Sequence, residues 1–184
     1  AVTVGANLTL TASSITTGST IAAGAHNLTL VTDALALGGN VSGGAGTLTI
    51  APKSAATTIG LGSGTNASGA TLQLSDTELG YINVASNYFA AIVIGDASAG
   101  TGTLKYDTSA NQNFHSTLTL QSYSGAITSY DQLDVSSSKN LTINSGGAVS
   151  LSTINTANVL AVTGTGITLN GSVTTTGTQT YTGA

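Results

Sequence analysis

The chain has 184 residues and a formal net charge of −4, and only 5% of its residues are charged, whereas an ordinary globular domain carries roughly a quarter. Three lysines and no arginine provide no basic patch for phosphate contacts, which argues against nucleic-acid binding. The 40% hydrophobic content argues against a disordered chain, because disordered sequences lack the apolar residues needed for a core.

The longest apolar run extends from Tyr88 to Ile94, far short of the roughly 20 residues that a membrane-spanning helix needs. We therefore predict no transmembrane segment. The chain has no cysteine, so disulfides give no indication of its compartment. Since the sequence starts without methionine or a signal segment, we expect it to be part of something longer.

The first 50 residues contain a repeat with a spacing of 20 residues, at 7–10 (Asn-Leu-Thr-Leu), 27–30 (Asn-Leu-Thr-Leu) and 47–50 (Thr-Leu-Thr-Ile). Each unit also contains two further apolar stretches, as at Ile15 and Ile21. The pattern predicts three short strands per unit.

Apolar and polar residues alternate within each repeat, as a strand with one buried face requires. Frequent glycines argue against helices and favour corners between strands. One coil buries its apolar face only when others stack on it, about 4.8 Å apart. We predict an all-β fold, a right-handed parallel β-helix (β-solenoid) with three strands per coil of about 20 or more residues.

The repeat returns downstream at wider spacings, which predicts roughly seven or eight coils and a single solenoid segment over residues 1–184. These later repeats have paired apolar residues at Leu72 and Leu74, Leu118 and Leu120, Leu141 and Ile143, and Ile167 and Leu169.

Residues 75–130 interrupt the repeat and contain seven of the eight aromatic residues. Ser75 and Glu78 form a capping-box pattern that predicts a short helical turn on the coil. The aromatic residues either fill widened, irregular coils or form a contact patch for glycan or protein. The candidate contact residues are Tyr81, Tyr88, Tyr106, Tyr123 and Tyr130.

Three asparagines, Asn7, Asn27 and Asn140, each precede an anchor leucine. This placement predicts a ladder of stacked, hydrogen-bonded amides. Asparagines in Asn-x-Ser/Thr sequences are also candidate glycosylation sites, a use that competes with the ladder. The six candidates are Asn7, Asn27, Asn40, Asn66, Asn140 and Asn170.

Parallel β-helices include polysaccharide-cleaving enzymes, and Asp131 and Asp134 form a close acidic pair. The chain lacks the cations that would hold an acidic polysaccharide, so we predict no catalytic residues. His26 and His115 lie far apart in the sequence without nearby ligands, and we predict no metal and no cofactor. Bound calcium is not predicted either, because the glycine-rich segment 38–44 lacks the aspartates of calcium-binding repeats.

Regular threonines such as those of Thr9-Leu10-Thr11 raise the alternative of ice binding on a flat face. The next two repeats place Val31 and Ala51 where Thr11 stands, which breaks a column two threonines wide.

The sequence resembles the filamentous haemagglutinin-like adhesins of two-partner secretion and, more broadly, the large bacterial β-strand repeat surface proteins. The resemblance extends over the whole chain and is carried by the Asn-Leu-Thr-Leu repeats and by residues 58–62, 70–79, 92–95 and 164–171. It implies a parallel β-helical shaft that an outer-membrane transporter secretes to the cell surface. We find no match to that family's amino-terminal secretion motif.

From these observations we expect a non-catalytic structural shaft of a secreted, surface-exposed bacterial adhesin or extracellular filament. Its expected partners are neighbouring β-helix segments or identical subunits end to end, with host or matrix glycan as a further candidate. The alternatives are a polysaccharide-binding or polysaccharide-cleaving β-helix protein and, as a weaker option, an ice-binding solenoid.

Overall fold

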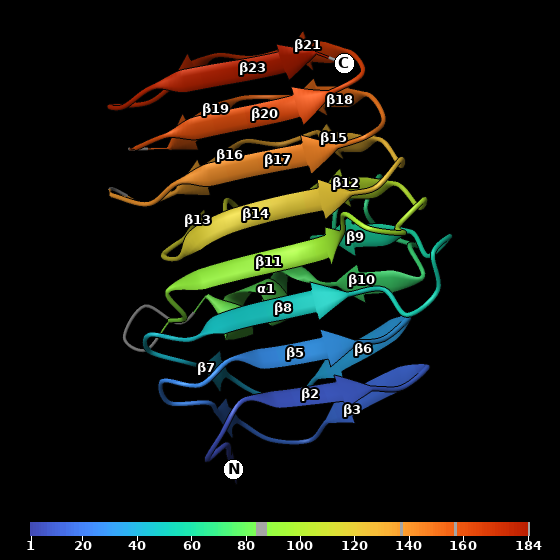
Figure 1. Ribbon diagram of the computed structural model, residues 1–184, viewed down its shortest axis with the longest axis vertical. Helices are drawn as coiled ribbons and strands as arrows, with labels where there is room; N and C mark the ends of the chain where they lie inside the picture. The colour runs from blue at the N-terminus through green and yellow to red at the C-terminus, as the bar shows by residue number, and fades with distance from the viewer. Residues whose placement is uncertain (84–87, 137, 157, 184) are drawn as a thin grey trace.

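The computed structural model describes residues 1–83, 88–136, 138–156 and 158–183. The chain forms a parallel β-solenoid that rises from the N-terminus at one end to the C-terminus at the other (Figure 1). Front strands point right and rear strands point left as the chain rises, so the coil is right-handed. The predicted fold class is confirmed, with one short helix in the described ranges.

The first side is an eight-stranded parallel sheet, seen in front in Figure 1. Its strands, in axial order, are β2 (Leu8–Thr11), β5 (Leu28–Val31), β8 (Thr47–Ala51), β11 (Ala91–Asp96), β14 (Thr117–Ser122), β17 (Leu141–Ser145), β20 (Leu160–Gly164) and β23 (Gln179–Gly183).

The second side consists of a two-stranded sheet followed by a six-stranded sheet that packs on it. The strands, again in axial order, are β3 (Ser14–Thr17), β6 (Ala34–Leu37), β10 (Leu72–Leu74), β9 (Ile59–Leu61), β12 (Leu104–Tyr106), β15 (Ile127–Ser129), β18 (Val149–Leu151) and β21 (Ile167–Leu169).

The third side is divided by the helix α1 (Asp76–Ile82). Before the helix come β1 (Val2–Thr3), β4 (Ile21–Ala22) and β7 (Val41–Ser42), and after it come β13 (Asn113–Phe114), β16 (Leu133–Val135), β19 (Ile154–Thr156) and β22 (Val173–Thr174).

The pairing register follows the sequence repeat. Leu8 pairs with Leu28 and Leu28 with Leu48, so the spacing of 20 residues is one coil. The next partner of Leu48 is Ile92, because an irregular segment lies between β8 and β11. Ile92 then pairs with Leu118, and the inward residues of successive coils make one continuous apolar core.

The irregular segment contains a reversal of strand order. The chain passes through β9, loops back over 62–71 and pairs β10 with β9 on the side nearer the N-terminus. The capping box is confirmed: the Ser75 hydroxyl accepts from the Glu78 backbone, and the Glu78 carboxylate accepts from the Ser75 backbone. The predicted interruption at 75–130 therefore combines a helix-containing segment with regular strands from β11 onward.

Helix α1 occupies the place of a third-side strand. It packs against β7 at one edge, and Asn83, just after its last turn, binds the next coil at the other. The Asn83 amide donates to the Asn113 carbonyl and accepts from the His115 backbone at 2.8 Å. The helix thus connects the two groups of third-side strands.

Candidate functional site

The five candidate tyrosines do not form one patch. Tyr123 and Tyr130 are 57% and 43% exposed, and they lie at different corners, just after β14 and β15 respectively. Tyr81 and Tyr88 are half-buried. Tyr106 is fully buried.

Tyr106 is a correction to the set of contact candidates. It is the last residue of β12, and its ring points inward on the same side of the strand as buried Leu104. Its hydroxyl has no hydrogen-bond partner among the described residues. Burial raises the pKa of Tyr106 to about 12, although the nearby Thr108 side chain and Gln112 backbone oppose that rise. The residue fills a widened coil and offers no surface to a ligand.

Tyr88 contacts residues of the chain through its ring. The ring stacks on His115 with centroids 5.9 Å apart and planes inclined by 24°. The Lys139 ammonium lies 5.3 Å from the centroid of the same ring, a cation–π contact. His115 Nδ1 is in turn 2.9 Å from the Ser136 hydroxyl. These contacts connect successive coils at this corner.

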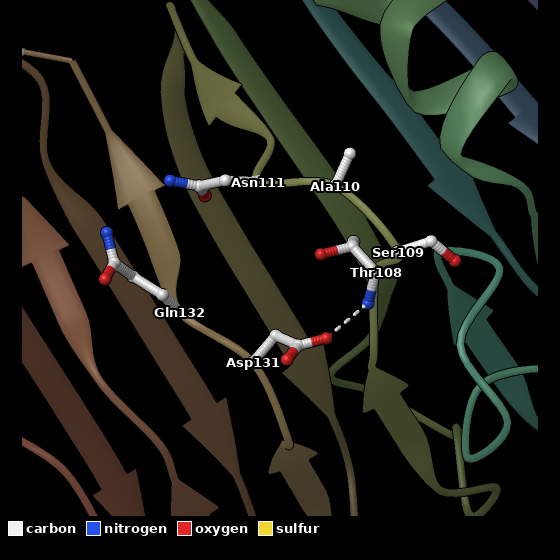
Figure 2. Close-up of a pocket in the computed structure, with 6 residues that line it drawn as sticks. All are labelled: Thr108, Ser109, Ala110, Asn111, Asp131 and Gln132. Atoms are coloured by element: carbon white, nitrogen blue, oxygen red, sulfur yellow. Dashed lines mark hydrogen bonds between the residues drawn. The ribbon is translucent and has the colours of Figure 1, made fainter.

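A shallow polar pocket of about 230 Å³ lies between the loops after β12 and β15. Figure 2 shows its lining, with Thr108, Ser109, Ala110 and Asn111 from one coil facing Asp131 and Gln132 from the next. The Thr108 backbone N–H donates to Asp131 Oδ2 at 2.9 Å. The carboxylate therefore anchors the loop of the preceding coil.

Asp131 and Asp107 lie near one another beside this pocket, and each carboxyl affects the pKa of the other. Burial, followed by the proximity of Asp107, raises the pKa of Asp131 above its ordinary value. Burial also acts to raise the pKa of Asp107, but hydrogen bonds from the backbone and side chain of Asn66 outweigh it and lower that pKa. Each carboxylate also accepts from the backbone of a loop in a neighbouring coil, Asp131 from Thr108 and Asp107 from Asn66.

Asp131 and Asp134, the acidic pair noted in the sequence, have different hydrogen-bond partners. Asp134 is buried and accepts from Gln132 Nε2 at 2.8 Å and from the Asn111 amide. The Asp131–Asp107 pair escaped the sequence analysis because its members are 24 residues apart in a region where coil lengths vary. Within the described residues no group of three or more His, Cys, Asp and Glu side chains is arranged to hold a metal ion.

The asparagine ladder takes a form different from the one predicted. Asn7 Oδ1 accepts from the Asn27 backbone N–H, and Asn27 Oδ1 accepts from the Thr47 backbone N–H, both at 2.9 Å. Asn140 Oδ1 accepts from the Val159 backbone and from the Asn158 amide. Asn7 and Asn27 therefore satisfy the backbone of the next coil, whereas Asn140 accepts from both a backbone N–H and a side-chain amide.

The remaining glycosylation candidates also differ in environment. Asn66 Nδ2 donates to Asp107 Oδ2, and Asn170 Nδ2 donates to the Ser150 hydroxyl, each at 2.8 Å. A glycan on either nitrogen would compete with that bond. Asn40 is exposed and lies immediately before β7.

Both ends of the described solenoid expose apolar residues and strands that are paired on one edge only. The N-terminal end has an apolar groove of about 530 Å³ lined mainly by Val2, Leu8, Leu10, Ile15 and Ile21. At the other end Leu169 is 44% exposed and Tyr181 is also exposed. Leu169 and Tyr181 have the inward register of the core, since they pair with buried Leu151 and Val162.

No family model, no curated protein and no solved structure matches this chain. Among the described residues, no helix has both the length and the apolar character needed to cross a membrane.

Proposed function

We propose that this chain is a non-catalytic structural shaft of a secreted, surface-exposed bacterial adhesin or extracellular filament. The observation that carries the proposal is a continuous parallel solenoid whose coils stack in register around one apolar core. Val2 is 53% exposed at one end and Leu169 is 44% exposed at the other. A stack of this kind lengthens when another coil or subunit packs on either end.

The two ends are complementary in strand direction. The strands of each side run parallel, and β2 and β23 are the two edge strands of the first side. The free edge of β23 in one unit can therefore pair in parallel with the free edge of β2 in the next. In a head-to-tail joint, Thr9 and Thr11 of one unit continue the rows of Thr180 and Thr182 of the other. Such a contact joins unlike surfaces and generates an open filament. We propose a neighbouring solenoid segment or an identical subunit as the partner.

Electron microscopy of the purified chain tests this proposal. We expect rods that lengthen with concentration, beyond the roughly 40 Å of one unit at the spacing of parallel strands. Leu10→Lys and Leu169→Lys each place a charge in one half of the joint, so either substitution should stop elongation. Thr128→Lys adds the same charge on the second side and serves as the matched control.

Single rods at every concentration, or filaments that form equally well in both end variants, would contradict the head-to-tail joint. Circular dichroism and the melting temperature verify that each variant is folded. The adhesive role is tested separately, by cell attachment of the folded protein and by localisation with an antibody.

A polysaccharide-binding or polysaccharide-cleaving solenoid is the second candidate. It is favoured by the polar pocket next to exposed Tyr130 and by the raised pKa of Asp131, the property of a general acid. Asp131→Asn would abolish cleavage of a soluble polysaccharide if this candidate is correct, and Asp134→Asn tests the other acidic residue. Unchanged polysaccharide in the presence of the wild-type protein would exclude cleavage.

A further inference from the structure

The outward surface of the eight-stranded first side is dominated by threonine. Inward residues of these strands are buried, and the residues between them point out. We call this surface the threonine face. Its central row contains, in axial order, Thr9, Thr29, Thr49, Val93, Thr119, Thr142, Ala161 and Thr180.

A second row runs beside the first and is less polar in its first half. It consists of Thr11, Val31, Ala51, Gly95, Gln121, Asn144, Thr163 and Thr182. Gly95 is in the left-handed region, with φ +106°, and a Cβ there would lie 1.9 Å from the Gln121 carbonyl oxygen. The row is therefore flat at its centre.

None of these outward positions in the described strands carries a charge, although the chain has a net charge of −4. Asp96 ends β11 but has the inward register of Ser122, and its carboxylate binds Ser98 at the corner. The second and third sides, in contrast, include Lys105 and Asp134 within their strands. The threonine face is thus the side on which two copies approach without opposing like charges.

The area of the face is sufficient for a weak specific contact. Eight strands at about 4.8 Å make the face about 38 Å long, and two outward rows, each about 7 Å wide, make it about 14 Å wide. These dimensions give roughly 500 Å² per copy, or about 1,000 Å² in total. Specific interfaces begin near this size. In Figure 1 no described helix or strand lies in front of this sheet.

We propose that the threonine face is a lateral docking surface for a second copy of this chain, face to face. Short β-branched side chains lose little rotamer freedom on docking. Successive threonines of a row lie about 4.8 Å apart, which allows the threonines of one copy to fit between those of the other. Such a pair is two-fold symmetric. The apolar residues Val31, Ala51 and Val93 favour contact with protein over ordered water. The two rows contain no aromatic ring on which a sugar could stack, since Tyr181 of β23 points inward.

Sedimentation velocity of the purified chain over a concentration series tests the proposal. We expect a reversible dimer that is broader, not longer, than the monomer. Thr119→Lys and Thr49→Lys place a charge in the centre and the first half of the face, and each should weaken dimerisation at least tenfold. Thr128→Lys, with the same change in charge on the second side, should leave it unchanged.

A wild-type protein that stays monomeric, or a dimer that persists in both face variants, overturns the proposal. If the wild type is monomeric but inhibits ice recrystallisation, and Thr119→Lys abolishes that inhibition, the occupant is crystalline water. Failure of lateral pairing can be distinguished from failure of the head-to-tail joint. Leu10→Lys should affect only end-to-end growth, and Thr119→Lys only lateral pairing.

Discussion

Asp33 shows how one side chain holds two coils together. It follows β5, and its carboxylate accepts from the backbone N–H groups of Lys53 and Ser54 one coil later. The Ser54 and Thr57 hydroxyls donate to it at 2.6 Å each. The hydroxyl bonds from Ser54 and Thr57 lower the pKa of Asp33 to about 2 from 3.8.

This shift predicts that the junction between the coils of β5 and β8 is sensitive to acid. The pKa of Asp33 is lower in the folded state, so its stabilising contribution is complete above pH 3.8 and is lost as the pH falls toward 2. Asp33→Asn should lower the melting temperature at pH 7 and reduce its decline between pH 4 and 2, as measured by circular dichroism. Asp96→Asn is the control, because the Asp96 carboxylate accepts from Ser98 in the adjacent turn of the same coil. Identical pH profiles for wild type and Asp33→Asn would refute the assignment.

Tyr106 shows that residue type alone does not predict whether a side chain is exposed, and that its position in the strand has to be considered as well. Aromatic composition marked it as a contact residue, yet the alternation of Leu104, Lys105 and Tyr106 places it inward with Leu104. That alternation was available in the sequence. The exposure of Tyr123 and Tyr130 was less predictable, because each stands at a corner where alternation stops.

At the scale of elements, helix α1 fills a position that a strand occupies in the other coils. Its capping box was predictable because Ser75 and Glu78 are three residues apart. The contact of the helix with β6 was not predictable, because it joins residues far apart in the sequence. Glu78 Oε1 accepts from the backbone N–H of Leu37, 41 residues earlier. Glu78 therefore both caps the helix and satisfies the end of a strand.

Glu78→Ala should destabilise the protein by about 1–3 kcal/mol, because it leaves the Leu37 and Ser75 N–H groups without their acceptor. Glu78→Gln keeps one acceptor oxygen but turns its NH2 group toward the other N–H donor, so it should recover only part of that loss. Chemical denaturation of the two variants measures the difference. Equal stability of Glu78→Ala and wild type would show that water replaces the carboxylate at both sites.

At the scale of the whole molecule, each coil is stabilised mainly by its two neighbours. The central strands β8, β11, β14 and β17 are paired on both edges, whereas β2 and β23 are paired on one. Hydrogen exchange should therefore be slowest in the central strands and fastest at the ends. Assembly end to end should slow exchange in β2 and β23, and lateral pairing alone should not. Uniform protection along the unassembled chain would contradict this additive behaviour.

The sequence by itself determined the solenoid, since Leu8, Leu28 and Leu48 recur at the length of one coil and alternation orients them inward. Only the tertiary structure decided the reversed order of β9 and β10, the Asp107–Asp131 pair and the uncharged threonine face. The physical reason is that repeats specify neighbours at a fixed separation. Contacts across irregular loops join residues at separations that no period encodes, so they become visible only when the coils are stacked.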